Sequence, residues 1–111
     1  MNKATKQRLE LHKILCELMD IHDSNGDRHV YFQPPASIRM KYPAIKYSLS
    51  DINNTYADNI SYKQLDAYEV ILIDADPDSI YINKLSQLPY CRFDRYYPSD
   101  NLNHYVFTLY Y

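Results

Sequence analysis

LPYCRFDRYYPSDNLNHYVFTLYY, residues 88–111, consists of two aromatic runs separated by a polar turn. In the second run Tyr105, Phe107, Leu109 and Tyr111 alternate with a more mixed set of residues, which is the period of a β-strand. The stretch therefore predicts a C-terminal β-hairpin. Because loose chain ends are usually polar and fray, the two final tyrosines indicate that this end pairs into a sheet or against another subunit.

The first part of the chain predicts an amphipathic helix from about Thr5 to Ile21. Its apolar residues recur at helical spacing, and they are Leu11, Ile14, Leu15, Leu18 and Ile21. A polar segment containing Asn25-Gly26 ends the helix, and a short strand is expected at about His29 to Phe32 before two prolines.

Two further strands are predicted in the middle of the chain, over 44–52 and 65–73. The first alternates apolar and polar residues, so one of its faces should be solvated. The second contains four consecutive aliphatic residues, 70–73, and is expected to be the central strand, buried on both faces. Between them the polar segment 53–64 predicts a long hairpin arm or loop.

The sequence DADPDS predicts the start of a second helix, with Asp76 as N-cap and Pro77 at the first helical position. This helix should run to about Leu88, before Pro89. The order is then helix, three strands, helix, two strands. It predicts an α+β fold, in which a mostly antiparallel sheet of about four to five strands packs against two helices. The 111 residues are expected to form a single domain.

Composition excludes several function classes. The net charge of −2 gives no basic field for nucleic acid, and specific nucleic-acid binding is not expected. The single glycine, Gly26, rules out glycine-rich nucleotide-binding loops. The sequence has no long apolar run and begins with a polar segment, so neither a membrane span nor a signal peptide is predicted. The 13 tyrosines favour a protein interface, although half-buried strand positions also use tyrosine.

No residue cluster predicts catalysis, a cofactor or a metal. Asp74, Asp76 and Asp78 resemble the start of a calcium loop, but serine and leucine occupy the positions that need glycine and glutamate. The segment HDSNGDRH offers His22, Asp23, Asp27 and His29 without any zinc spacing. Cys16 and Cys91 are interpreted as small buried residues, since Cys91 has only His104 as a conceivable base. We therefore expect a protein that is not an enzyme.

The segment from Asp76 to Tyr111 carries a resemblance to a known family. Its DPDS turn before a helix, LPYCRFDRYY strand, SDNLNH turn and aromatic closing strand resemble the tail terminator, or tail completion, proteins of long-tailed bacteriophages. The looser likeness extends back to Leu9. The resemblance implies a small α/β subunit that forms a ring, with a hexamer favoured. Such a ring caps the tail tube, meets the head connector or head-closure protein, and belongs to a virion assembled in the bacterial cytoplasm.

Two groups of residues are candidates for contacts between subunits or with partners. The first combines the charged residues of the penultimate strand with the turn that follows, because arginine and tyrosine are enriched at interface centres. Its members are Arg92, Asp94, Arg95, Asp100, Asn101 and His104. The second lies in the polar arm and comprises Tyr56, Asp58 and Asn59. The alternative for the charged strand is a solvated face with weak ion pairs.

Three functions remain open from the sequence. A tail terminator is the leading hypothesis, a head-closure protein of the phage neck is its nearest alternative, and a small monomeric regulatory module would need only one such surface. Oligomeric state separates the ring-forming proteins from the monomeric module.

Overall fold

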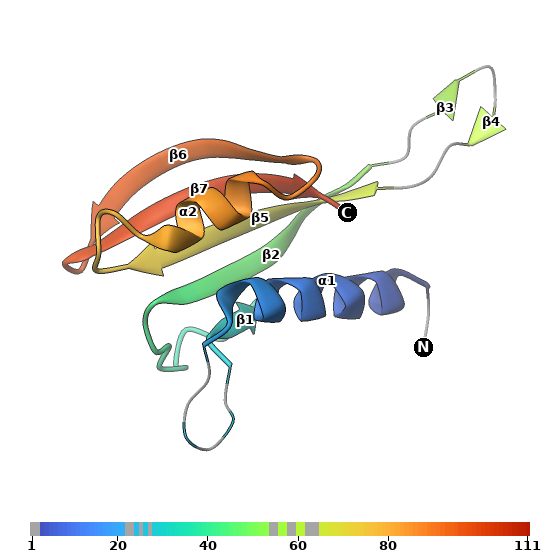
Figure 1. The fold of residues 1–111 in the computed structure, drawn as a ribbon. Coiled ribbons are helices and arrows are strands. Elements are labelled where there is room, and N and C mark those ends of the chain that lie inside the picture. The colour runs from blue at the N-terminus through green and yellow to red at the C-terminus, as the bar shows by residue number, and fades with distance from the viewer. Residues whose placement is uncertain are drawn as a thin grey trace.

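The computed structural model describes residues 3–21, 24, 26, 28–53, 56–57, 60–61 and 65–111, and the side chains of residues 5–21, 24, 26, 28–50 and 66–111. The elements follow the predicted order (Figure 1). They are α1 (Lys3–Met19), β1 (Val30–Phe32), β2 (Ala44–Asn53), β3 (Tyr56–Ala57), β4 (Ile60–Ser61), β5 (Leu65–Asp74), α2 (Ile80–Ser86), β6 (Cys91–Ser99) and β7 (Leu102–Tyr110). The α+β prediction is confirmed.

One five-stranded sheet, in the order β1-β2-β5-β7-β6, forms the centre of the molecule. Only the β1–β2 pair is parallel, and the other three pairs are antiparallel. The aliphatic strand β5 lies in the middle, as its sequence predicts. Strands β1 and β6 form the two edges of this sheet, on opposite sides of the molecule (Figure 1).

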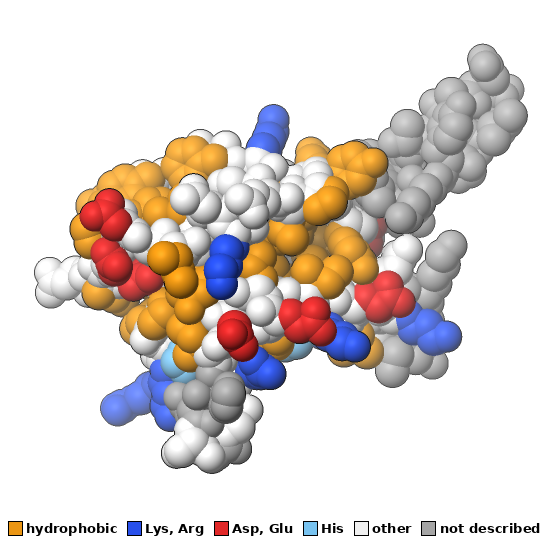
Figure 2. Space-filling model, in the orientation of Figure 1, with side chains coloured by type: hydrophobic (Ala, Val, Ile, Leu, Met, Phe, Trp, Pro, Cys, Tyr) orange, Lys and Arg blue, Asp and Glu red, His pale blue; other side chains and the backbone are white. Residues whose placement is uncertain are grey.

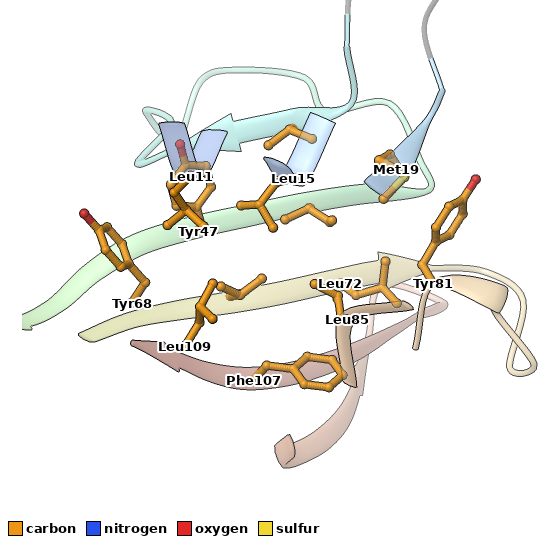
Figure 3. Packing of buried hydrophobic residues seen from close by; sticks show 13 residues of the cluster. Leu11, Leu15, Met19, Tyr47, Tyr68, Leu72, Tyr81, Leu85, Phe107 and Leu109 are labelled. Carbon is orange, nitrogen blue, oxygen red and sulfur yellow. The ribbon is translucent and has the colours of Figure 1, made fainter. Parts of the chain in front are cut away.

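Both helices cover the same face of the sheet, and the main core lies between them and the strands. Leu11, Leu15 and Met19 of α1 point toward this core, and Tyr81 and Leu85 of α2 belong to it as well (Figure 3). The strands contribute alternate residues, which include Ile45, Tyr47, Val70, Leu72, Phe107 and Leu109. Burial of these side chains supplies the main stabilisation of the fold, since each contributes about 1.5–3 kcal/mol relative to an exposed position.

The opposite face of the sheet has no helix among the described residues. Ile71, Ile73 and Val106 form a smaller cluster there, and Met40 and Leu102 pack against it. As expected, β5 is buried on both faces, since all four of its consecutive aliphatic residues, 70–73, are buried. The cover on this side, however, comes from the loop before β2 and from the sheet's own side chains. We call this side the helix-free face.

The first helix ends two residues earlier than predicted. Asp20 has a φ of 47°, outside the helical region, and its backbone N–H donates to the carbonyl of Cys16 at 3.0 Å. Met19, which the sequence-based stripe omits, is completely buried, whereas Ile21 is only half-buried. The end of α1 is therefore set by the left-handed turn at Asp20.

The start of α2 also differs from the prediction. Ser79, not Asp76, is the N-cap, and its Oγ accepts a hydrogen bond from the Tyr81 N–H at 3.3 Å. Asp74 and Asp76 accept instead from the backbone N–H groups two residues further on, at 3.0 and 2.9 Å. These side-chain turns compete with the helix for the backbone donors, so the helix begins later.

The C-terminal hairpin is confirmed, with a shorter turn than SDNLNH suggests. Asp100 and Asn101 have φ values of 53° and 63°, as in the two-residue turn favoured between antiparallel strands, and His104 lies within β7. The chain end pairs into the sheet, as predicted. The Tyr111 N–H donates to the Asp66 carbonyl at 3.0 Å, and the Asp66 N–H donates back at 3.1 Å.

The predicted arm contains a short hairpin. Strands β3 and β4 pair through Tyr56 with Ser61 and Ala57 with Ile60, beyond the end of the β2–β5 ladder (Figure 1). Asp58 and Asn59 lie outside the described residues, and the side chain of Tyr56 is likewise not described.

Candidate functional site

Strand β6 is an edge strand whose side chains face solvent along almost its entire length. Cys91 is half-buried, and the other eight residues are exposed. They include three large aromatic residues, Phe93 at 53% exposure, Tyr96 at 48% and Tyr97 at 37%. Edge strands of monomeric proteins are normally short or shielded, because an exposed apolar edge invites association. The β6 edge is therefore the candidate interface of this protein.

A β-bulge interrupts β6 at Asp94. Phe93 pairs with Phe107 and Arg95 with Val106, so Asp94 is an additional residue in the strand. The bulge places Arg92 and Arg95 on the face opposite to Phe93. A bulge and Pro98 both hinder the backbone pairing of a further strand along the whole edge. Contacts made by side chains are therefore better suited to β6 than extension of the sheet.

On the helix-covered face, the aromatic side chains of β6 are held in place by β7. Phe93 packs edge-to-face on Phe107 with ring centroids 5.6 Å apart, and Tyr96 packs on Tyr105 at 5.2 Å. The Tyr96 hydroxyl also donates to Asn103 Oδ1 at 2.8 Å. These exposed rings thus lose little side-chain entropy when they contact a partner, which favours binding.

On the helix-free face, β6 carries charged and aromatic pairs. Arg95 lies 3.1 Å from the Asp94 carboxylate and 3.7 Å from that of Glu69 on β5. Tyr97 stacks on His104 of β7, with centroids 4.7 Å apart and an angle of 14° between the rings. The Arg95 pairs are exposed, so each contributes about 1 kcal/mol or less to stability.

The structure brings only part of the predicted interface together. Arg92, Asp94 and Arg95 lie on β6, His104 contacts the same strand through Tyr97, and Asp100 and Asn101 form the β6–β7 turn. The arm lies beyond the Leu65 end of β5, whereas that turn lies near the Asp74 end. Strands β3 and β4 of the arm and the β6–β7 turn thus lie toward opposite ends of the sheet.

Sequence reasoning missed two contributors to the β6 surface. Glu69 is far from Arg95 in sequence, and only strand order places them two strands apart on the same face. The exposed aromatic side chains at Phe93 and Tyr96 were not among the predicted interface residues. Their alternation signals a strand but cannot indicate whether the strand lies at an edge.

A groove of about 270 Å³ lies between α1, the loop after α2 and the end of β7. Leu11 and Ile14 line one side, and Leu88, Tyr90 and Tyr110 line others. The Tyr111 hydroxyl, also at the groove, donates to Glu10 Oε2 at 3.3 Å. The described residues that line this groove include no histidine, cysteine, lysine or arginine.

Cys16, Cys91 and His29, which were weighed for chemistry, lie in half-buried or buried positions. Burial raises the pKa of the Cys91 thiol to about 11, and burial is also the main cause that raises the pKa of Cys16, so both thiols stay protonated at neutral pH. His29 is buried with its Nδ1 3.0 Å from the Pro43 carbonyl oxygen. His22, Asp23 and Asp27 lie outside the described residues. In the part of the chain that the structure describes, no group of acidic, histidine and cysteine side chains is placed to hold a metal ion.

An acidic loop lies beside the β6 edge. The Asn103 side chain donates to the Ala75 carbonyl at 3.3 Å, and the Tyr105 hydroxyl donates to the Pro77 carbonyl at 3.1 Å. Burial raises the pKa of Tyr105, and nearby Tyr96, Asp74, Asp78 and Asp76 add to the rise. The loop between β5 and α2 is therefore fixed against β7, next to Tyr96.

Comparisons with protein family models, with curated proteins and with solved structures found no match. No helix in the described part of the chain has the length and apolar character needed to cross a membrane.

Proposed function

We propose that this protein is a structural subunit of a bacteriophage neck, a tail terminator that forms a ring, caps the tail tube and joins it to the head connector. The resemblance over Asp76 to Tyr111 supplies the family. The observation that carries a role in assembly is the β6 edge, with Phe93, Tyr96 and Tyr97 exposed over a nine-residue strand.

The proposed role needs a surface that binds protein. Aromatic residues and arginine are enriched at interface centres, and β6 presents both on a single edge. In addition, the two sheet edges differ in sequence and lie on opposite sides of the molecule. Contact between unlike surfaces of identical subunits either closes into a ring or continues indefinitely. A ring of such subunits, sixfold by the resemblance, would end a tube.

The function is tested in the phage that encodes the chain, by deleting the gene and imaging the particles. Loss of a terminator should leave DNA-filled heads and separate tails of uncontrolled length. Loss of a head-closure protein should instead leave tails of normal length and heads that leak DNA. Normal, infectious particles would contradict both neck functions and favour a regulatory module.

Cells infected by the deletion phage should then be supplied in trans with one gene at a time. One is the parent gene, and another is a variant that lacks two of the exposed β6 aromatic residues, Phe93→Ser with Tyr96→Ser. The parent gene should restore joined particles, and the double variant should not. As a matched control, Leu9→Ser with Leu49→Ser removes two comparably exposed hydrophobic side chains that lie neither on β6 nor in the charged regions described below. Equal restoration by all three genes would show that the β6 edge has no role in assembly.

A further inference from the structure

Charge is distributed unevenly along the chain. Residues 28–50 contain four lysines or arginines and no aspartate or glutamate, whereas residues 65–83 contain five acidic residues and no lysine or arginine. The first segment includes β1 and the start of β2, and the second includes β5 and the start of α2. The fold therefore converts a pattern in the sequence into two regions of opposite charge.

The acidic region, here called the acidic patch, adjoins the β6 edge and consists of Asp76, Asp78, Ile80, Tyr96 and Asp100. All five are exposed, and Ile80 is 63% exposed. Neither Asp76 nor Asp78 forms an ion pair with any described residue. The neighbouring cation on α2, Lys84, lies over the Tyr81 ring with its Nζ 5.3 Å from the centroid. Arg92 lies near the other end of β6.

The basic region, here called the basic patch, lies at the β1 side of the sheet and consists of Ile38, Arg39, Tyr42 and Lys46, from the loop before β2 and the start of β2. Ile38 and Tyr42 are exposed hydrophobic residues, at 43% and 42%. Arg39 is also exposed and forms no ion pair with a described residue. Both patches thus combine charged and exposed apolar side chains, and the charges have opposite sign.

The two patches lie at the same end of the sheet but on opposite edges. Ala44, just after the basic patch, pairs with Ile73, and Asp74 pairs with Asn103 near the β6–β7 turn. In Figure 2, acidic side chains gather at the upper left by the β5–α2 loop, and basic ones gather at the lower left by the loop before β2. A neighbouring subunit placed beside the sheet edge would bring unlike patches into contact.

We infer that the acidic patch of one subunit binds the basic patch of a second copy of this chain, in a head-to-tail contact. This inference rests on the proposed function, because it assigns the surfaces that close its ring. The occupant is a second copy because the complementary charges and exposed apolar residues are both present on this chain. Like-charged variants of either patch should repel, since opposed like charges across an interface are strongly unfavourable.

The contact is tested by reversing one charge at a time and measuring assembly by sedimentation over a range of protein concentrations. Asp78→Lys reverses one charge of the acidic patch, and Arg39→Glu reverses one charge of the basic patch. Each alone should require about tenfold more protein than the parent to assemble, equivalent to roughly 1.4 kcal/mol. Glu17→Lys and Lys13→Glu carry the same charge changes at exposed sites on α1 and should assemble like the parent.

Mixing the two patch variants provides the decisive result. In an equimolar mixture the two intact patches can pair with each other, and so can the two altered patches, whose reversed charges are again of opposite sign. The mixture should therefore assemble at about the concentration of the parent. Thermal unfolding of each variant checks that the monomer is intact. Patch variants that assemble like their α1 controls, or a mixture no better than its components, would overturn the inference.

A parent protein that stays monomeric at every concentration would also overturn the contact. The gene-deletion phenotype is independent of these surfaces. Uncontrolled tail length combined with unaffected patch variants would therefore reject the contact and retain the proposed function. Normal particles after deletion would reject the function itself.

Discussion

Strands β5 and β6 both pair with β7, yet they have contrasting surroundings. β5 is flanked by β2 and β7, and its aliphatic residues Val70, Ile71, Leu72 and Ile73 are all buried. β6 has β7 on one side and solvent on the other, and its aromatic residues are exposed. Apolar and aromatic side chains thus serve the core in one strand and a surface in the other, according to position in the sheet.

The largest expected difference in unfolding free energy is between substitutions at the two members of one aromatic pair. Phe107 is fully buried and Phe93 is 53% exposed, although the rings touch. Phe107→Ala should lower the free energy of unfolding by about 3–5 kcal/mol, because it leaves a cavity in the core. Phe93→Ala should lower it by roughly 1 kcal/mol or less while weakening assembly.

Urea unfolding of both variants, followed by circular dichroism at a concentration where the parent is monomeric, measures the difference. Equal losses of stability would mean that β6 belongs to the core, and the contrast between the strands would disappear.

An intermediate effect concerns the pH dependence of the helix-covered core. Burial, with the positive charge of Arg8, lowers the pKa of His12 below 6.5. Its Nδ1 lies 2.6 Å from the Tyr47 hydroxyl, and burial raises the pKa of that hydroxyl to about 12, so a neutral hydroxyl shares a hydrogen bond with the imidazole. The contribution of His12 to stability is therefore complete above about pH 6.5 and is lost as pH falls through its folded-state pKa.

Replacement His12→Gln should accordingly flatten the decline in unfolding free energy below pH 6.5, as measured by urea unfolding at several pH values. Lys13→Gln alters the adjacent exposed residue and should retain the decline of the parent. An unchanged decline below pH 6.5 in His12→Gln would show that the pKa of His12 is the same in the folded and unfolded states.

The smallest expected effect on stability is at the β6 charges. Asp94→Ala should change the free energy of unfolding of the monomer by about 1 kcal/mol or less, because the pair with Arg95 is exposed. If the pair becomes buried between subunits, the same change should cost assembly roughly 3–5 kcal/mol. Thermal unfolding of the monomer and sedimentation of the assembly measure the two quantities separately. Assembly equal to that of the parent would place Asp94 on a solvated face.

Much of the fold follows from the sequence because its hydrophobic periods are regular. The helix over α1, the aliphatic β5 and the alternating β2 and β7 are each defined by their own residues. The start of α2 was predicted wrongly because Asp74, Asp76 and Ser79 are all capable caps, and local hydrogen bonding decides among them. Such a choice depends on geometry that composition does not contain.

The candidate site was less predictable than the fold. Tyrosine content alone could not separate core from surface, since Tyr47 is fully buried and Tyr96 is exposed. The pairing of Arg95 with Glu69 and the separation of the arm from the β6–β7 turn depend on strand order. Strand order arises from long-range contacts, which the periodicity of single segments does not encode.

The central claim, that the β6 edge is covered on assembly, is tested most directly by amide hydrogen exchange. Exchange should be compared between dilute monomer and concentrated assembly of the same protein. Amides of β5 should be slow in both states, because that strand is buried between neighbours. Amides of Arg92 to Ser99 should exchange faster in the monomer and become protected in the assembly. Protection unchanged over β6, with new protection elsewhere, would contradict the account.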